Sequence, residues 1–444
     1  MEKQTSLQLD DGSQIAVIGG GPAGSFFSYF LLDMAERVGI DVRVDIYEPK
    51  DFSRPGPAGC NHCGGVVHES LVQILATEGI ILPPTVVQRG IDSHMLHMGV
   101  GSVRIETPLD EKRIGAVFRG SGPRGIKERK WGSFDGHLLS LAVNKGANVI
   151  HGRVTEVSWK DGRPQIKTRD GSPQAYDLLA VAAGVNTAVL KLFPGLEFGY
   201  QPPGTTKTFV CEYHLGQETI GTYLGSSVHV FLLNLPRLEF AALIPKGDCV
   251  TMCLVGEEID KELVRSLLDS PEVKQCFPPN MPLDQDACHC SPRINVQGAV
   301  QPFADRIVFV GDCGVARFYK DGIGSAYRVA KAAATTAIFQ GISAADFSRH
   351  YGPVCRALGT DNIIARVVFA IARQIQKRRF TRRAVLRMIT REQRKESGRQ
   401  RMSMVMWDMF TGGAPYREIF LRTLHPAFWV PFLWHSLVSL ISKR

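Results

Sequence analysis

A glycine-rich turn near the N-terminus has the residue types and the spacing that bind the pyrophosphate of a dinucleotide. The segment VIGGGPAG at 17–24 follows the apolar run at 15–18, precedes a helix that we expect over residues 25–38, and is followed by Glu48. In such a turn the first glycine permits the tight bend, the second lets the backbone approach the phosphates, and the third lets the helix pack on the strand. Free N–H groups at the positive end of the helix dipole then hold the phosphates, and the acid accepts hydrogen bonds from the adenosine ribose. The residues expected to bind the dinucleotide here are Gly19, Gly21, Pro22, Ala23, Gly24 and Glu48.

Later segments indicate that this dinucleotide is FAD. Residues 305–312 form a short apolar strand that ends in Gly-Asp, and residues 320–326 read KDGIGSA before a long alanine-rich helix. In FAD proteins of the glutathione-reductase and hydroxylase type, an aspartate at the position of Asp312 bonds the ribityl chain, and the next helix N-terminus faces the flavin ring. Residues 176–184 resemble the strand that returns the chain to the nucleotide domain in those proteins. The cofactor contacts added by these segments, and by a strand expected at 148–150 together with Val154, are Gly311, Asp312, Gly322, Ile323, Gly324 and Val154.

Two segments beside the expected flavin carry side chains that can move protons. Cys60, His62 and Cys63 lie in a loop rich in glycine, proline and cysteine. Tyr319 and Lys320 precede the flavin-facing turn. Each of the five could act as a general acid opposite a flavin hydride, since that acid must lie within reach of the substrate. For each residue taken alone, a hydrogen bond to its loop or to the flavin is the favoured interpretation.

The cysteines leave three interpretations open. Cys60 and Cys63 form a CxxC pair and Cys288 and Cys290 form a CxC pair, which together could hold a metal or an iron–sulfur cluster if the fold joined them. A CxxC pair can also close a redox-active disulfide. Reduced thiols packed against the flavin are the favoured interpretation, so no metal site is predicted. Cys313 is expected near the flavin ring, and the remaining cysteines are expected in the core: Cys211, Cys249, Cys253, Cys276 and Cys355.

The chain of 444 residues has a net charge of +9, and most of the excess lies in one segment. Residues 356–401 contain fourteen Arg and Lys but three acids, whereas residues 423–442 carry no charged side chain and four Phe and Trp. Basic helices beside an aromatic, apolar segment are typical of contact with an anionic membrane surface, and this neighbour argues against a nucleic-acid partner. The alternative is that this region packs on the flavin domain as amphipathic helices. Because residues 1–14 lack the apolar core of a secretory signal and the chain has ten cysteines, we expect a cytoplasmic protein peripherally associated with a membrane.

The order of the patterns predicts an α/β fold, in which a Rossmann-type FAD-binding domain is joined to a mixed β-sheet substrate domain and a helical C-terminal region. Strands are expected within 84–119 and 205–255, a helix over 136–147, and mostly helices after Gly341. A second GxGxxG that opens a helix is absent from the sequence, which argues against a disulfide reductase with a separate NAD(P)H domain. The predicted division gives the FAD-binding domain residues 1–83, 120–200 and 291–345, the substrate domain residues 84–119 and 201–290, and the C-terminal region residues 346–444.

These motifs resemble the geranylgeranyl reductase family of flavoproteins, within the hydroxylase-like FAD superfamily. The likeness runs over about residues 14–340, and it rests on the glycine turn, Glu48, Phe134-Asp135 and the two later segments. The Cys63-Gly64-Gly65 turn is closer to the reductases than to the superfamily at large. The resemblance implies reduction of isolated C=C bonds in prenyl chains, with a hydride from flavin N5 and a proton from a second group. It therefore implies an isoprenoid or lipid-like substrate, with NAD(P)H as a candidate electron donor.

The chain departs from the family pattern in three places. The YxWxFP-type signature reads FAALIP at 240–245, with alanine where tryptophan belongs, which opens space for a bulkier substrate. Trp131 replaces the usual arginine before Phe134-Asp135, although Arg129 and Lys130 are close. Ala183-Gly184 replaces an Asp-Gly that assists nicotinamide handling in hydroxylases. The alternatives are an FAD monooxygenase of a hydrophobic substrate, a flavin dehydrogenase that passes electrons to quinone, and an FAD-bound scaffold without activity; the absence of WxWxIP disfavours a halogenase.

Overall fold

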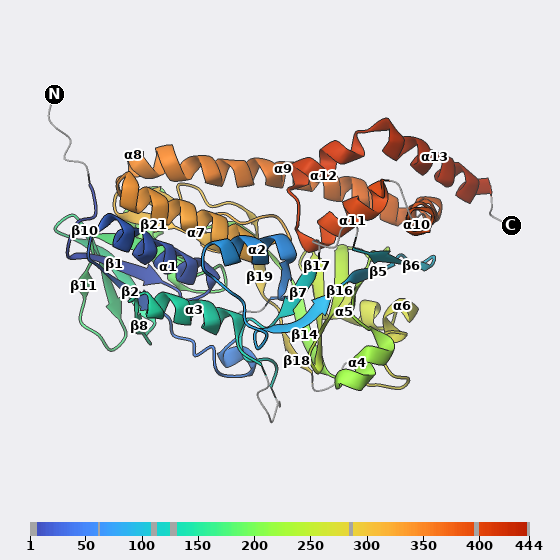
Figure 1. The fold of residues 1–444 in the computed structure, drawn as a ribbon, viewed down its shortest axis with the longest axis horizontal. Coiled ribbons are helices and arrows are strands. Elements are labelled where there is room, and N and C mark those ends of the chain that lie inside the picture. Colours follow the sequence, from blue (N-terminus) through green and yellow to red (C-terminus); the bar gives the residue numbers. More distant parts are fainter. Residues whose placement is uncertain are drawn as a thin grey trace.

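The computed structural model describes residues 7–60, 63–107, 113–124, 131–283, 287–394 and 399–441. Its core is an α/β body with two main sheets, and a row of helices from the C-terminal part of the chain runs along one side of both (Figure 1). This arrangement confirms the predicted fold class. The division into domains by residue number stays a prediction.

The first sheet is the nucleotide-type sheet, with six strands in the order β20-β21-β12-β1-β2-β8. All neighbouring pairs are parallel except β20 and β21. The central strand reads SQIAVI and is almost wholly buried, as expected for a parallel strand covered on both faces. The strands are β1 Ser13–Ile18, β2 Val42–Tyr47, β8 Asn148–Ile150, β12 Leu178–Val181, β20 Phe303–Ala304 and β21 Ile307–Phe309.

Helices α1 and α7 pack against each other on this sheet, and α3 packs beside α1 (Figure 1). Pro22 begins α1, because proline has no N–H to leave unpaired in the first turn, and Gly39 ends it in the left-handed conformation. The helix expected over 136–147 begins earlier, because the Ser133 side chain caps it by accepting from the Gly136 N–H at 3.0 Å. These helices are α1 Pro22–Val38, α3 Phe134–Asn144 and α7 Gly322–Phe339, with the shorter α2 Glu69–Thr77 nearby.

The second sheet has seven strands in the order β18-β14-β17-β16-β15-β5-β6. Its pairs are antiparallel except for β15 with β5, so the sheet is mixed as predicted. One face is covered by α4–α6, and the other faces a cavity described below. The elements are β5 Ser93–His97, β6 Ser102–Glu106, β14 Phe209–His214, β15 Ser227–Phe231, β16 Leu238–Lys246, β17 Cys249–Gly256, β18 Cys288–Cys290, α4 Gln217–Tyr223, α5 Lys261–Leu268 and α6 Pro271–Lys274.

Three small sheets accompany the two large ones, and one of them corrects the sequence analysis. Val154 does not continue the strand β8 into the nucleotide sheet. The Gly152 N–H bonds the Ile150 carbonyl at 2.8 Å in a turn that ends β8, and Val154 then begins β9 in a separate antiparallel sheet. The small sheets comprise β3 Val66–His68, β4 Val87–Ile91 and β7 Ile114–Val117; β9 Val154–Lys160, β10 Arg163–Thr168 and β11 Gln174–Ala175; and β13 Gly204–Lys207 with β19 Arg293–Gln297.

The C-terminal region is helical, as predicted, and much of it packs on the rest of the molecule. Helix α9 contacts α7 and β19, α10 contacts β6, and α11 contacts β3, so these helices bridge the nucleotide and substrate sides (Figure 1). Helix α13 packs on α10 and extends to the far end of the row. The helices are α8 Ala344–Asp346, α9 Gly352–Lys377, α10 Arg379–Gln393, α11 Arg401–Thr411, α12 Tyr416–Thr423 and α13 Pro426–Ile441.

In the part of the chain that the structure describes, none of the helices has by itself the length and hydropathy needed to cross a membrane. Helices α12 and α13 meet those requirements only as a pair, and they are bent by 67° where they join.

Candidate functional site

A cavity of about 980 Å³ extends from the nucleotide sheet to the second sheet. Most residues that the sequence assigned to the cofactor line it, and their individual roles stay predictions. Those in the wall are Gly19, Gly21, Pro22, Ala23, Glu48, Val154, Asp312, Gly322 and Ile323. The other three glycines support this wall from behind: Gly24 packs on Gly19, Gly311 contacts Ala23, and Gly324 contacts Asp321.

The glycine turn leaves no space for side chains. Gly19 has a φ of +107°, and a Cβ there would lie 2.5 Å from the Ala182 carbonyl oxygen. A Cβ at Gly24 would lie 1.8 Å from the Gly19 carbonyl oxygen. The Gly24 approach holds the first turn of α1 against the end of β1, as the motif requires. The Gly19 approach holds the turn against the residue that follows β12.

Glu48 closes the same turn from the end of β2. Its carboxylate accepts from the Gly20 N–H and from the Lys50 N–H, each at 2.8 Å. Burial raises the pKa of Glu48, while these two backbone hydrogen bonds act in the opposite direction. A carboxylate has about four acceptor positions, so Glu48 keeps capacity for the hydroxyl groups of a ribose.

Two helix N-termini meet the cavity, and this is the structural test of the FAD prediction. Neither α1, which follows Gly21, nor α7, which follows Asp321, has a side-chain cap on its first turn. Their N–H groups are therefore available to anionic or carbonyl oxygens of a ligand. Asp312 lies in the wall between them, where burial raises its pKa and the charge of Arg119 lowers it. The residues present fit FAD: α1 and Glu48 would hold its pyrophosphate and ribose, and Asp312 and α7 would hold the ribityl chain and the flavin.

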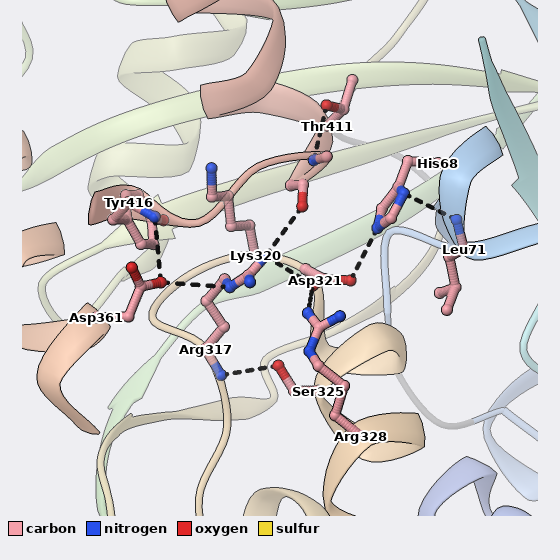
Figure 2. A network of polar contacts seen from close by, with 12 residues as sticks. His68, Leu71, Arg317, Lys320, Asp321, Ser325, Arg328, Asp361, Thr411 and Tyr416 are labelled. Atoms are coloured by element: carbon pink, nitrogen blue, oxygen red, sulfur yellow. Dashed lines mark hydrogen bonds and ion pairs between the residues drawn. The ribbon is translucent and has the colours of Figure 1, made fainter. Parts of the chain in front are cut away.

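The N-terminus of α7 is fixed by a buried group of charges centred on Asp321 (Figure 2). The Arg317 Nη1 donates to the Asp321 carboxylate at 2.8 Å, Arg328 also pairs with it, and the His68 Nε2 lies 3.4 Å away. Burial opposes the charge of Asp321, but the His68 hydrogen bond and the two arginines hold its pKa below the usual value. Asp321 itself adopts a left-handed φ of 52°, which these contacts over-determine.

The same group ties the C-terminal helices to the turn before α7. The Arg317 Nη1 also donates to the Gly412 carbonyl at 2.9 Å, and its Nε lies 3.5 Å from the Asp361 carboxylate (Figure 2). Asp361 in turn accepts from the backbone N–H of Tyr416 at 3.1 Å. Gly412 has a φ of +80°, and a Cβ there would lie 2.7 Å from the Asp321 Cβ. Helices α9, α11 and α12 therefore form part of the site.

Lys320 and Tyr319, two of the catalytic candidates, lie in the cavity wall. The Lys320 Nζ donates to the Asp408 carbonyl at 2.7 Å and lies 4.2 Å from the centre of the Tyr416 ring. Burial, assisted by the charge of Arg317, lowers the pKa of Lys320 to about 7. Burial raises the pKa of Tyr319 above its usual range. Lys320 is thus a group in the cavity wall that titrates near neutral pH.

The three catalytic candidates of the flavin-side loop differ in where the structure places them. Cys63 lies in the cavity wall, and its Sγ accepts from the Gly65 N–H at 3.4 Å. Cys60 is half-buried, and its carbonyl oxygen accepts from the Lys50 Nζ at 2.8 Å. His62 lies outside the described residues. Gly65, two residues after Cys63, allows the loop to pass close to β7. It has a φ of +67°, and a Cβ there would lie 2.0 Å from the Val117 carbonyl oxygen.

No disulfide joins the cysteines, all of which are described. Cys290 lies near enough to Cys60 and Cys253 for their charges to affect its pKa, which burial raises above the usual range. Among the described residues, the side chains that converge as metal ligands do are His97, His229 and Cys276. The CxxC and CxC pairs do not form such a group in this structure.

Arg119 and Lys246 line or flank the site and were missed by sequence reasoning. Arg119 forms a two-pronged ion pair with Asp135, including an Nη2–Oδ2 contact of 2.9 Å. Burial opposes the charge on Arg119, but Asp135 keeps its pKa above the usual range. No sequence signal pointed to this pair, because the chain just after β7 delivers Arg119 from sixteen residues upstream of Asp135. Lys246 is 1% exposed, and its Nζ lies 2.9 Å from where a Cβ on Gly65 would be.

The second sheet supplies an apolar wall to the cavity. Phe240, Ala242 and Ile244 of β16 face it, and these are the alternate residues of the FAALIP segment. The space that alanine leaves in place of tryptophan would therefore lie in the cavity, and its role stays a prediction. The other apolar residues of this wall are Phe209, Val210, Val228, Val230, Cys253, Leu254 and Val255.

Comparison with known proteins gives the fold its context. No protein-family model matches the chain, and no curated protein matches it. Among solved structures, the flavoprotein/dehydrogenase from Cytophaga hutchinsonii superposes with a TM-score of 0.62 at 14% identity, over 98% of this chain and 100% of that chain. The halogenase PltM, solved with ethyl mercury and mercury, gives a TM-score of 0.59 at 12% identity, over 97% of this chain and 92% of that chain.

A third similar structure is p-nitrophenol 4-monooxygenase PnpA from Pseudomonas putida DLL-E4, with a TM-score of 0.57 at 12% identity, over 91% of this chain and 98% of that chain. A mutant of PltM has also been solved in complex with FAD. The chain has the fold of the FAD-binding flavoproteins. At these identities the likeness concerns the fold, and the resemblance to geranylgeranyl reductases stays a prediction.

Proposed function

We propose that this protein is an FAD-dependent oxidoreductase that reduces C=C bonds of an isoprenoid or another lipid-like substrate. The observation that carries the proposal is the cavity, which leads from two uncapped helix N-termini to an apolar wall. The described side chains that β14–β17 place in this wall are uncharged. Such a wall favours an apolar substrate, because a charged one would lose its hydration without gaining a partner.

Reduction of a C=C bond adds a hydride to one carbon and a proton to the other. When bound, FAD supplies the hydride from its flavin ring. Lys320 is the best placed proton donor, since with a pKa of about 7 its ammonium form is populated near neutral pH and gives up a proton readily. The Asp408 carbonyl holds the Lys320 Nζ in the cavity wall, and Tyr319 is the poorer acid because its pKa is raised.

We also propose that the protein binds an anionic membrane surface, from which the substrate enters. Helix α9 exposes Ile363, Val367 and Ile371 at successive turns, and α12 exposes Leu421, with Leu424 just after it. Helix α13 adds a further exposed apolar group, in which Trp434 is 60% and Ile441 is 71% exposed. Exposed basic residues accompany these helices, as expected for contact with anionic headgroups: Lys377, Arg378, Arg379, Arg391 and Arg394.

The membrane proposal is tested by sedimentation with vesicles. Wild-type protein should sediment with vesicles that contain phosphatidylserine and less with phosphatidylcholine alone. The double change Trp434→Glu and Leu437→Glu should reduce binding at least about tenfold, because each charge would enter the apolar boundary. Ile81→Glu is the control, since Ile81 is 69% exposed and lies in the loop between α2 and β4. Equal binding by all three proteins would refute a membrane contact through α13.

A second candidate function is oxygen insertion into a hydrophobic substrate. It is favoured by the similarity in fold to a protein described as a monooxygenase. Transfer of electrons to a quinone and a flavin-bound scaffold without activity are further alternatives.

One rapid-mixing experiment separates these functions. The purified holoprotein is photoreduced without oxygen and mixed with a geranylgeranyl-bearing lipid, and the flavin absorbance is followed. Reoxidation with a mass gain of two hydrogens per reduced bond supports the reductase. No reoxidation, followed on admission of oxygen by an oxygenated product, supports the monooxygenase. Reoxidation only by a quinone, or a flavin that NAD(P)H and other reductants fail to reduce, would instead favour the dehydrogenase or the scaffold.

A further inference from the structure

Three buried side chains converge on the face of the second sheet that lies away from the cavity. The His97 Nε2, on β5, is 3.1 Å from the His229 Nδ1, on β15. The Cys276 Sγ, just after α6, is 3.2 Å from the same His229 Nδ1. All three ligand atoms lie within 4.8 Å of one another, and the three residues are 3%, 7% and 1% exposed.

The spacing of these atoms is close to that of a zinc site. Bonds of about 2.0–2.1 Å to nitrogen and about 2.3 Å to sulfur place two nitrogens about 3.4 Å apart, and a nitrogen and a sulfur about 3.6 Å apart, in a tetrahedral site. The two pairs that include the His229 Nδ1 therefore need to separate by only a few tenths of an ångström to admit the ion, and the third pair lies within 4.8 Å. Two imidazoles and a thiolate are ligands that zinc prefers, whereas calcium and magnesium prefer oxygen ligands.

Hydrogen bonds on the outer side of the group orient the rings as ligands. The His97 Nδ1 lies 2.7 Å from the Ser102 Oγ, and the His229 ring also hydrogen-bonds the backbone of Leu224. Metal-binding histidines commonly bond a backbone carbonyl or a hydroxyl through the nitrogen that does not touch the metal. If the His97 Nδ1 and the His229 Nε2 carry the ring hydrogens, the His97 Nε2 and the His229 Nδ1 face each other with a lone pair each. A cation bound between them then accepts both lone pairs.

Metal binding needs two neutral imidazoles and a thiolate. The imidazoles are already neutral, and the thiol becomes a thiolate when the metal binds. Burial lowers the pKa of His97 to about 3 and that of His229 to about 4, so both rings are neutral at physiological pH. Burial raises the pKa of Cys276 to about 12, so the metal must displace the thiol proton. Binding therefore releases one proton and leaves a thiolate bonded to the ion.

We propose that His97, His229 and Cys276 bind a zinc ion that fastens the α4–α6 cover to the second sheet. Two ligands belong to the sheet and the third to the segment after α6, so the ion crosslinks elements separated by more than forty residues. Among the described residues, no fourth His, Cys, Asp or Glu side chain belongs to the group. The site lies on the opposite face of the sheet from the cavity wall, because Val228 and Val230, which flank His229, line the cavity. Its role is structural, and it does not depend on the function proposed above.

The test is the metal content of the purified full-length flavoprotein. Wild-type protein should contain about one zinc per chain by mass spectrometry, and its cobalt-substituted form should show a thiolate-to-cobalt charge-transfer band. Cys276→Ser should lose both. Cys211→Ser, which changes a buried cysteine on β14 outside the group, should keep the zinc and the cobalt band.

Chelation gives a second readout that does not depend on the variants folding. Removal of the metal from wild-type protein should lower its melting temperature, and added zinc should restore it. Wild-type protein without metal that binds neither zinc nor cobalt would overturn the proposal and leave a hydrogen-bonded group. A cobalt band that persists in Cys276→Ser, or copper in place of zinc, would also overturn it.

Discussion

The two ends of the cavity are built in different ways. At the nucleotide end, the contacts are close backbone approaches, of Gly24 to Gly19 and of Gly19 to Ala182, and Glu48 reaches Gly20 across 28 residues. At the other end, buried charges join distant segments, and Arg317 reaches Gly412 across 95 residues. The first end therefore depends on the absence of side chains, whereas the second depends on every charge keeping its partner.

The largest effect is expected where a side chain is added to the nucleotide end. Gly24→Val should leave the purified protein without flavin, since even a Cβ would overlap the Gly19 carbonyl oxygen. The measurement is the ratio of released flavin to protein. Gly359→Ala is the control, because a Cβ on that glycine of α9 meets open space. A Gly24→Val protein with full flavin content would show that this end is less constrained than proposed.

At the other end, loss of a buried charge should lower the free energy of unfolding more than loss of an exposed one. Asp321→Asn keeps the shape of the side chain but leaves Arg328 without its carboxylate and Arg317 with only that of Asp361, 3.5 Å away. We expect a loss of about 3–5 kcal/mol in the free energy of unfolding, measured with urea. Asp269→Asn, which breaks an exposed pair with Lys274, should change it by less than about 0.5 kcal/mol. Equal losses would contradict the difference between buried and exposed pairs here.

A change in the apolar wall separates substrate binding from cofactor binding. Ala242→Trp fills space that Phe240 and Ile244 border, on the side of the cavity away from the glycine turn. We expect normal flavin content and a fall of at least about tenfold in kcat/KM for a prenyl lipid, equivalent to about 1.4 kcal/mol. Loss of flavin in this variant would show that the two ends are not independent.

The last comparison concerns the pH dependence of stability. Between about pH 7, the pKa of Lys320 in the folded protein, and its ordinary value of 10.5, the folded protein binds fewer protons at this amine than the unfolded chain. Stability from this group therefore rises with pH over that interval, and it is lowest where the buried amine must carry its charge. Lys320→Met should reduce the rise in melting temperature with pH, and the exposed control Lys274→Met should not. An unchanged profile in Lys320→Met would contradict the lowered pKa.

Sequence reasoning predicted the nucleotide sheet well because its signals are local. Glycine spacing, the buried run of β1 and the acid at the end of β2 each require a particular backbone within one unit. The same reasoning misplaced Val154, because the turn at Gly152 ends β8 and the following strand pairs elsewhere. The alternation of apolar residues and the β-propensity of a segment predict a strand, but they do not predict which strand it pairs with.

The C-terminal region shows the opposite case. Its charge and its aromatic segment were visible in the sequence, and both the membrane contact and packing on the flavin side were open. The structure places Asp361 and Gly412 around Arg317, so part of this region belongs to the site, while α13 keeps several of its apolar residues exposed. Which buried charges a helix will satisfy depends on neighbours that are far away in sequence.

The sequence by itself determined the fold class, the glycine turn and the acid that closes it, because those features follow from short-range backbone geometry. Only the tertiary structure decided that Asp135 pairs with Arg119, and that His97, His229 and Cys276 meet behind the sheet. Alternation along β5 and β15 sets which face each histidine occupies, but the pairing of the two strands brings them together. Long-range pairing creates these sites, and single-sequence patterns carry no record of it.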